Sequence, residues 1–245
     1  MKKKTSILIC SFLMMGVLVM LANSYKKDDN NNTPDNTVKD IDGNVYQTVT
    51  IGTQVWMVEN LKTTKYRNGD PIPNVTDDTE WSNLTTGAQC NYNNDAAIGN
   101  KYGKLYNWYA VSDGRNIAPT GWHVPSDAEW TTLENYVAAN LGTSGSVAKA
   151  LASKTDWASS TDAGAVGNDL TKNNSSGFTA LPGGYRYGYG GFSSIGFNGY
   201  WWTSTEGSSD YAWNRNLGCY DPVVGRSSNY GYEGRVFSVR CVRDN

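Results

Sequence analysis

Apolar and polar side chains first alternate in the segment NVYQTVTIGTQVWMVENL, residues 44–61. Its β-branched and aromatic residues flank Gly52 and Thr53, so the pattern predicts two strands joined by a tight turn at that point. The following stretch, residues 66–95, is too rich in turn-forming residues for regular elements and is predicted to be a long loop. Residues 103–111 form a short apolar run that is compatible with either a strand or a helix.

A helical period follows in the middle of the chain. Four apolar side chains recur at spacings of three or four residues, which predicts an amphipathic helix that ends at Gly142: Trp130, Leu133, Val137 and Leu141. Ser126 and Glu129 stand just before this period and complete the S-x-x-E pattern of a capping box. A second, shorter helix is predicted over residues 146–154.

The capping box decides how the only histidine of the chain is interpreted. The Ser126 hydroxyl is expected to accept from the N–H of Glu129, whose side chain reaches back to the N–H of Ser126. Asp127 adds negative charge at the positive end of the helix dipole. His123 is therefore interpreted as a partly buried ring hydrogen-bonded to backbone. Because no G-x-S-x-G motif accompanies this single histidine, a Ser-His-Asp triad is not predicted. A histidine-based zinc site is not predicted either, because one histidine cannot supply a ligand cluster. No catalytic residue, metal or cofactor is predicted.

The last third of the chain, from Gly177 onward, is rich in tyrosine, glycine, serine and asparagine. Short strands are predicted at residues 200–205, 211–217 and 235–242, with long loops between them. Trp201 and Trp202 are neighbours in the first of these strands, and neighbouring side chains of a strand point to opposite faces. One of the two is therefore expected in the core and the other on the surface.

The composition is that of a soluble globular protein. A net charge of -2 gives no basic footprint for nucleic acid, so no nucleic-acid partner is predicted. Nine tryptophans and sixteen tyrosines stand against only five phenylalanines. Because tyrosine and tryptophan join a large apolar body to a polar group, this bias favours a half-exposed binding surface.

The N-terminal segment is a basic MKKK followed by a long apolar run without charge until Lys26. Small residues before Tyr25 allow cleavage there, so residues 1–24 are predicted to be a signal peptide and residues 25–38 a flexible polar tether. The expected location is outside the cytoplasm: cell surface, outer membrane-associated or periplasmic. An uncleaved anchor helix is the alternative, and membrane contact is expected only through such a leader or a further anchor.

Six motifs in order resemble the Fibrobacter succinogenes major paralogous domain family, found on exported proteins of Bacteroidetes and Fibrobacter: DIDGNVYQTVTIGTQVWMVENL, YGKLYNWYAV, PTGWHVPSDAEW, GFTALPGGYR, WWTSTE and FSVRCVRD. The resemblance assigns residues 39–245 to one such domain. That family is similar in turn to the fold group of formylglycine-generating enzymes and C-type lectins. The implied class is α+β, with two helices on a small twisted antiparallel sheet and long loops that bear the ligand site.

The chain departs from these relatives at three kinds of position. The leader resembles that of exported lipoproteins, but Tyr25 stands in place of the lipidated cysteine, so no acylation is expected. Formylglycine-generating enzymes hold copper with two closely spaced cysteines, whereas Cys90, Cys219 and Cys241 are widely separated in sequence. Outside the cytoplasm these three give at most one bridge and at least one free thiol, with the pairing open. Calcium-dependent lectins carry an acidic residue where Arg215 stands, so calcium is not predicted.

The favoured function is a non-enzymatic recognition module, displayed outside the cell, that binds glycan or a surface protein. Aromatic rings stack on the apolar faces of sugars, and tyrosine and arginine dominate contacts between proteins. The predicted contact residues are Tyr185, Arg186, Tyr187, Tyr189, Trp213, Arg215, Tyr220, Arg226, Tyr230 and Tyr232. The competing interpretation of this set is packing of strands and loops. The alternative functions are a structural or fimbria-associated surface subunit and, less favoured, an oxidase of the formylglycine-generating type.

Residues 208–232 raise a further hypothesis. Many of their residue types are reachable from an asparagine codon by changing its adenines. This composition resembles that of the C-terminal regions that diversity-generating retroelements rewrite in some lectin-like folds. Cys219 would then be a chance product on a tolerant surface. An ordinary polar, glycine-rich loop is the simpler interpretation of the same composition.

Overall fold

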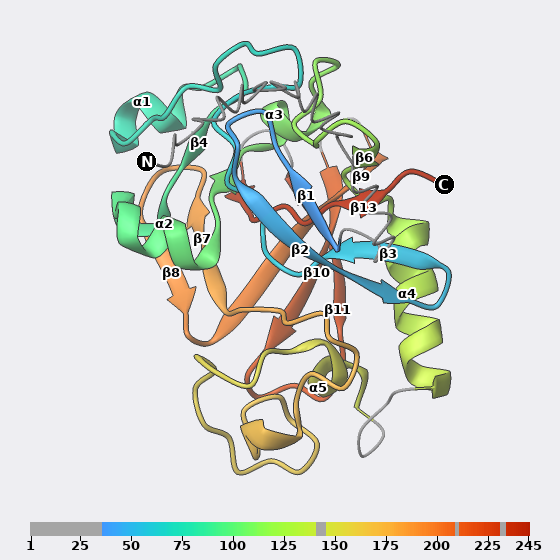
Figure 1. Cartoon of the computed structure of the whole chain (residues 1–245). Helices are drawn as coiled ribbons and strands as arrows, with labels where there is room; N and C mark the ends of the chain where they lie inside the picture. The colour runs from blue at the N-terminus through green and yellow to red at the C-terminus, as the bar shows by residue number, and fades with distance from the viewer. Residues whose placement is uncertain (1–35, 141–145, 209–210, 231–233) are drawn as a thin grey trace, which may run out of the picture. The chain divides into compact units, whose positions relative to one another are not determined.

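The computed structural model of the protein describes residues 36–140, 146–208, 211–230 and 234–245. The predicted signal peptide lies outside these ranges, as do Leu141 and Gly142 at the predicted end of the long helix. The described chain consists mainly of short strands in three sheets with a few helices around them, which confirms the α+β class (Figure 1). Within these ranges no helix is both long and apolar enough to cross a membrane.

The first sheet joins the beginning and the end of the domain. Its five strands follow the order β1-β2-β3-β13-β6: β1 (Thr37–Lys39), β2 (Val45–Ile51), β3 (Gln54–Met57), β13 (Val242–Arg243) and β6 (Trp122–His123). The predicted hairpin is confirmed as β2–β3, and its turn uses a positive φ of 63° at Gly52. Val242 pairs with both Trp56 and His123, so the last strand lies between two earlier ones. Strand β1 includes the last two residues of the predicted tether.

The second sheet has six strands and carries most of the predicted contact residues. Five follow the order β11-β10-β9-β7-β12, and β8 pairs with β7: β7 (Gly183–Tyr187), β8 (Phe192–Ile195), β9 (Asn198–Ser208), β10 (Tyr211–Gly218), β11 (Gly225–Tyr230) and β12 (Arg235–Val236). The pairs are antiparallel except between β7 and β9, where Gly184 lies beside Gly199 in parallel. Strands β9 and β10 confirm the strands predicted at residues 200–205 and 211–217. The third predicted strand is broken into β12 and β13, and β7, β8 and β11 replace predicted loops.

The segment predicted as a long loop contains short regular elements, so that prediction is wrong in part. They are α1 (Asp78–Ser82), β4 (Gln89–Cys90) and the 3-10 turn η1 (Tyr92–Asn94), followed by α2 (Ala96–Tyr102). The Asp77 carboxylate accepts from the N–H of Glu80 at 2.8 Å and so caps α1. Turn-forming residues in this segment therefore mark helix caps as well as loops.

The ambiguous apolar run contains one element of each kind. Strand β5 (Leu105–Tyr106) pairs with β4 in a two-stranded sheet, and helix α3 (Trp108–Ser112) follows it directly. Asn107 separates the two elements, and its side chain accepts from the N–H of Ala110 at 3.0 Å. The cap ends the strand and starts the helix within a single residue.

The long helix is α4 (Asp127–Asn140), and it begins at the predicted capping box. The Ser126 N–H donates to Glu129 Oε2 at 2.8 Å, and the Glu129 N–H donates to Ser126 Oγ at 3.2 Å. Three of the predicted apolar residues form its buried side: Trp130, Leu133 and Val137. The second helix, α5 (Val147–Leu151), is shorter than predicted, and η2 (Leu170–Lys172) follows in the same loop-rich region. Figure 1 shows α4 on the side of the domain opposite α1 and α2.

Strand β9 is covered by apolar side chains on both faces. On one face Trp201 packs against Trp130 of α4, with ring centroids 6.2 Å apart. On the other face Trp202 packs against Trp108 and Phe237, at 5.3 Å and 4.5 Å. Both indoles are fully buried, so the expectation that one would be exposed is wrong. The two side chains alternate as predicted, but a second layer covers the second face.

Candidate functional site

The ten predicted contact residues do not form one surface. Gly218 at the end of β10 pairs with Asn198, and Gly199 lies beside Gly184 near the start of β7. Tyr220 therefore lies at the level where β7 begins, whereas the tyrosines at the end of β7 lie toward the other end of the sheet. Tyr232 and the side chain of Tyr230 lie outside the described part of the chain.

Arg186 belongs to the predicted set, but its side chain is fully buried. It lies on the face of β7 opposite its tyrosine neighbours, because side chains alternate along a strand. Its guanidinium donates to the carbonyl of Val75 at 2.8 Å and to Asp78 Oδ1 at 2.7 Å, and it lies 4.2 Å from the ring centroid of Trp81. The prediction of a ligand contact is wrong here, since Arg186 holds α1 and the preceding loop against the sheet.

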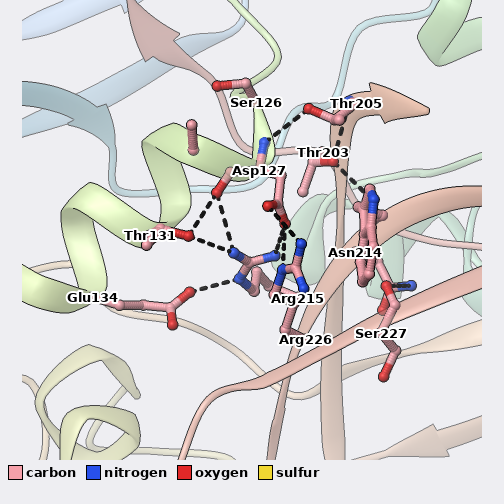
Figure 2. Close-up of polar contacts among 12 residues, drawn as sticks. Ser126, Asp127, Thr131, Glu134, Thr203, Thr205, Asn214, Arg215, Arg226 and Ser227 are labelled. Carbon is pink, nitrogen blue, oxygen red and sulfur yellow. Dashed lines mark hydrogen bonds and ion pairs between the residues drawn. The ribbon is translucent and has the colours of Figure 1, made fainter. Parts of the chain in front are cut away.

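Arg215 is the second predicted contact residue for which the expected ligand contact is wrong. Its fully buried guanidinium lies between two carboxylates of α4, with Nη1 2.6 Å from Asp127 Oδ1 and Nε 2.6 Å from Glu134 Oε1 (Figure 2). Further donors reach the carbonyl of Asp127 and the hydroxyl of Thr131, both at 3.1 Å. A guanidinium with these partners attaches α4 to the sheet and has no surface left for a ligand.

Arg226 and Trp213 form an exposed pair beside this buried contact. Arg226 donates to both oxygens of Asp127, at 2.9 Å and 3.0 Å, and its side chain is 47% exposed. Its Cζ lies 3.7 Å from the centroid of the half-buried Trp213 ring. The hydrogen bond from Arg226 and the nearby Arg215 hold the pKa of Asp127 below its ordinary value. Both arginines are thus neutralised inside the molecule.

Three predicted residues do form a continuous aromatic surface, which we call the tyrosine row: Tyr185, Tyr187 and Tyr189. Tyr185 meets Tyr187 edge-on at 4.9 Å, and Tyr187 stacks on Tyr189 at 4.8 Å with an angle of 16° between the rings. Exposure rises along the row from 6% for Tyr185 to 71% for Tyr189. Because Tyr187 covers one face of Tyr189, the open surface of Tyr189 is largely its outer face.

Arg235 completes the tyrosine row, although the sequence did not single it out. It pairs with Tyr187 across β12 and β7, and its Cζ lies 4.5 Å from the ring centroid of Tyr185 and 5.2 Å from that of Tyr187. Burial raises the pKa of Tyr185, while the hydrogen bond between the two hydroxyls lowers that of Tyr187. Strand β12 has only two residues, so its register could not be predicted from its pattern.

A cavity of about 250 Å³ opens next to Arg235. Its wall is formed by residues 81–85 at the end of α1, by Asn107 and Tyr109 at the start of α3, by Gly188 after β7, and by residues 234–236. Asparagine, serine, threonine and tyrosine groups dominate this wall, and none of these lining residues is acidic. The cavity is therefore a polar recess in which Arg235 is the only charged side chain among the described wall residues.

The position of this wall depends on Asn107. The side-chain oxygen of Asn107 accepts from the N–H groups of Ala88 and Ala110 at 2.9 Å and 3.0 Å, and its amide donates to the carbonyl of Thr86 at 2.9 Å. One buried side chain thus ties the loop after α1 to the start of α3. Such a fully bonded polar residue fixes the shape of the recess.

The diversification hypothesis conflicts with burial at two positions. Within the hypothesised segment, residues 211–218 and 225–230 pair as the β10–β11 hairpin. Cys219 is 1% exposed in an apolar cluster, and Asn214 is fully buried with its amide donating to the carbonyl of Ser227 at 2.9 Å. Neither site tolerates free substitution, so the proposed explanation of Cys219 is wrong.

Tyr220 is 56% exposed, and its ring centroid lies 6.5 Å from that of Phe197, in a patch separate from the other predicted contact residues.

His123 has different partners from those predicted. Its Nε2 lies 2.8 Å from Glu129 Oε1, and its Nδ1 lies 2.6 Å from Asp244 Oδ1. Partial burial is confirmed, but the expected backbone partner is wrong, because both partners are carboxylates. The hydrogen bond with Glu129 raises the pKa of His123 despite burial. Burial raises the pKa of Glu129, yet its bonds with His123 and Ser126 outweigh this and bring it to about 2.

The three cysteines of the predicted mature chain are buried and free. Cys90, Cys219 and Cys241 belong to three different apolar clusters. Burial raises the pKa of each thiol, that of Cys90 to about 11. No two of them are placed to hold copper as a pair, and none presents a thiol at the surface for an intermolecular bridge. Among the described residues, no cluster of three or more histidine, cysteine, aspartate or glutamate side chains could hold a metal ion.

The fold and the site define an α+β domain with an exposed aromatic row beside a polar recess. The model of the Fibrobacter succinogenes major domain family matches residues 49–243, which is most of the chain. The protein therefore belongs to this family. No curated protein and no solved structure matches it.

Proposed function

We propose that this protein is an exported recognition module that binds glycan at the tyrosine row and the recess beside Arg235. The observation that carries the proposal is the outer face of Tyr189, which is 71% exposed while its inner face is stacked on Tyr187. A ring held in this way loses little conformational freedom when a ligand binds, since it is already fixed in the free protein. Its flat apolar face suits the C–H face of a sugar ring.

The polar recess supports the same ligand class. Sugars expose hydroxyl groups along their edges, and these groups need donors and acceptors when water is displaced. Asparagine amides, hydroxyl groups and the Arg235 guanidinium line the recess next to the tyrosine row. A glycan lying across both would stack one residue on Tyr189 and place the polar edge of its neighbour among these groups.

The proposed relationship to C-type lectins and formylglycine-generating enzymes agrees with this function. It is supported by the two helices α4 and α5 beside antiparallel strands, by the pairing of β3 with β13 near the two chain ends, and by the loop-rich segments between them. In this proposal the ligand site lies on loops and strand ends of the second sheet. Display at the cell surface or in the periplasm rests on the leader sequence, a basic start followed by a long apolar run.

Binding of the purified protein to a glycan array tests the proposal. Tyr189→Ala and Tyr187→Ala should each abolish the signal seen with the unchanged protein. Tyr220→Ala removes another exposed tyrosine, at the other end of the sheet, and serves as the matched control, with binding retained. Absence of any glycan signal, or equal binding by all three variants, would contradict the proposed site. Covalent or non-covalent multimers in sedimentation analysis, without glycan binding, would instead favour the structural-subunit alternative.

A further inference from the structure

Arg235 differs from the other buried and half-buried arginines in what it contacts. Four of those arginines donate to carboxylates or to backbone carbonyls: Arg67, Arg186, Arg215 and Arg240. Arg235, in contrast, lies on the ring faces of Tyr185 and Tyr187, and no carboxylate among the described residues pairs with it. Among the described residues no hydrogen-bond acceptor meets the N–H donors at the edge of this guanidinium, which lies on the two rings. These donors are the feature that a ligand can use.

The surroundings of these donors favour an anion. None of the described residues that line the recess is acidic, so a negative group entering it meets the single positive charge of Arg235. The nearby helix α1 carries two carboxylates, Asp78 and Glu80, and neither lines the recess. Asp78 is already bonded to Arg186 and to the N–H of Gly191. A guanidinium edge matches a carboxylate best, because two parallel N–H groups bond its two oxygens.

We propose that the recess binds the carboxylate of an acidic sugar, so that the protein recognises glycans containing uronic acids or similar residues. The inference rests on the proposed function and specifies its ligand class. Arg235 bonds the carboxylate inside the recess, and the adjoining sugar stacks on the outer face of Tyr189. A glycan is favoured over an acidic peptide because the row offers a flat, open aromatic face that suits the apolar face of a sugar ring.

Matched pairs of oligosaccharides separate this inference from the proposed function. The binding constants of the purified protein are measured by calorimetry for oligogalacturonate and for its neutral methyl ester, and likewise for oligomannuronate and oligomannose. The acidic member of each pair should bind about 10- to 100-fold more tightly, as expected for one charge-assisted contact. Arg235→Gln should remove this preference, and Arg235→Lys should retain part of it because the charge remains but the fork is lost.

The matched control is Arg243→Gln, which removes an exposed arginine of β13 and should leave the preference intact. Thermal unfolding of each variant shows that it is folded. Equal binding of acidic and neutral members would overturn the inference and leave the proposed function standing. Binding of poly-glutamate as tight as that of the uronates would overturn the assignment to sugars. Binding of no oligosaccharide, on the array or here, would contradict the proposed function itself.

Discussion

Nε2 of His123 lies 2.8 Å from Oε1 of Glu129, while Oε2 of the same carboxylate accepts from the N–H of Ser126 at 2.8 Å. One side chain therefore caps α4 and binds the only histidine of the chain. Because His123 also reaches Asp244 near the C-terminus, the start of α4 and the last residues of the chain are joined through one imidazole. This arrangement makes the stability of the domain sensitive to pH.

The free energy of unfolding should fall as the pH rises from 6 to 9. The pKa of His123 is raised in the folded protein, so its contribution is complete below the ordinary value of 6.5 and is lost as the pH rises through the folded value. Glu129, with a pKa of about 2, contributes fully above its ordinary 4.5, and this contribution is lost as the pH falls from that value through about 2. Urea unfolding across this range measures the effect. His123→Gln should flatten the alkaline slope, and an unchanged slope would contradict the assignment.

Replacing Arg215 should destabilise the protein much more than replacing Arg226, although both bond the same carboxylate. Arg215→Ala leaves Asp127 and Glu134 partly buried without their shared cation and should cost about 3–5 kcal/mol. Arg226 is 47% exposed, so Arg226→Ala should cost no more than about 1 kcal/mol. Chemical unfolding of the two variants gives the comparison. Similar costs for both would show that the buried contact is not what attaches α4 to the sheet.

Trp201→Ala and Trp202→Ala should be comparably destabilising, at about 3–5 kcal/mol each. Each indole is fully buried and each donates a hydrogen bond, Trp201 to Asn60 at 2.8 Å and Trp202 to the carbonyl of Tyr106 at 2.9 Å. Trp213→Ala, on the neighbouring strand, removes a half-buried indole and should cost less. If either of the first two changed the midpoint of urea unfolding no more than Trp213→Ala does, that face of β9 would not be covered as described.

Lys149→Met should cost about 1–3 kcal/mol, because it leaves the partly buried carbonyl oxygen of Asn168 without its donor and removes the second donor from the carbonyls of Ala165 and Asp169. The Nζ atom of this 2% exposed lysine donates to the carbonyls of Ala165 at 3.2 Å, Asn168 and Asp169 at 3.4 Å. The ammonium group thus holds the loop that follows α5. Lys172→Met is the control in the same loop, since its side chain is 60% exposed and should cost at most a few tenths of a kcal/mol. Equal effects in thermal unfolding would contradict this role.

Features that depend on residues three or four apart could be predicted from the sequence. The capping box of Ser126 and Glu129, the buried side of α4 and the β2–β3 turn at Gly52 all formed as expected. Each is a local arrangement whose geometry follows from backbone periodicity and one or two hydrogen bonds. The α+β class follows from the same local patterns.

Features that depend on distant partners could not be predicted in this way. Tyr187 and Arg186 are neighbours in sequence with similar promise as ligand contacts, yet only Tyr187 lies beside the recess, because β7 turns Arg186 toward α1. Arg235 joins the tyrosine row only through its register with β7. Whether an alternating side chain meets solvent, a carboxylate or a second core is decided by what covers its face. That layer comes from distant parts of the chain, such as Val75 for Arg186 and Asn60 for Trp201, 111 and 141 residues away. The sequence by itself determined the elements and their caps, and the tertiary structure alone decided which aromatic and basic side chains remain available to a ligand.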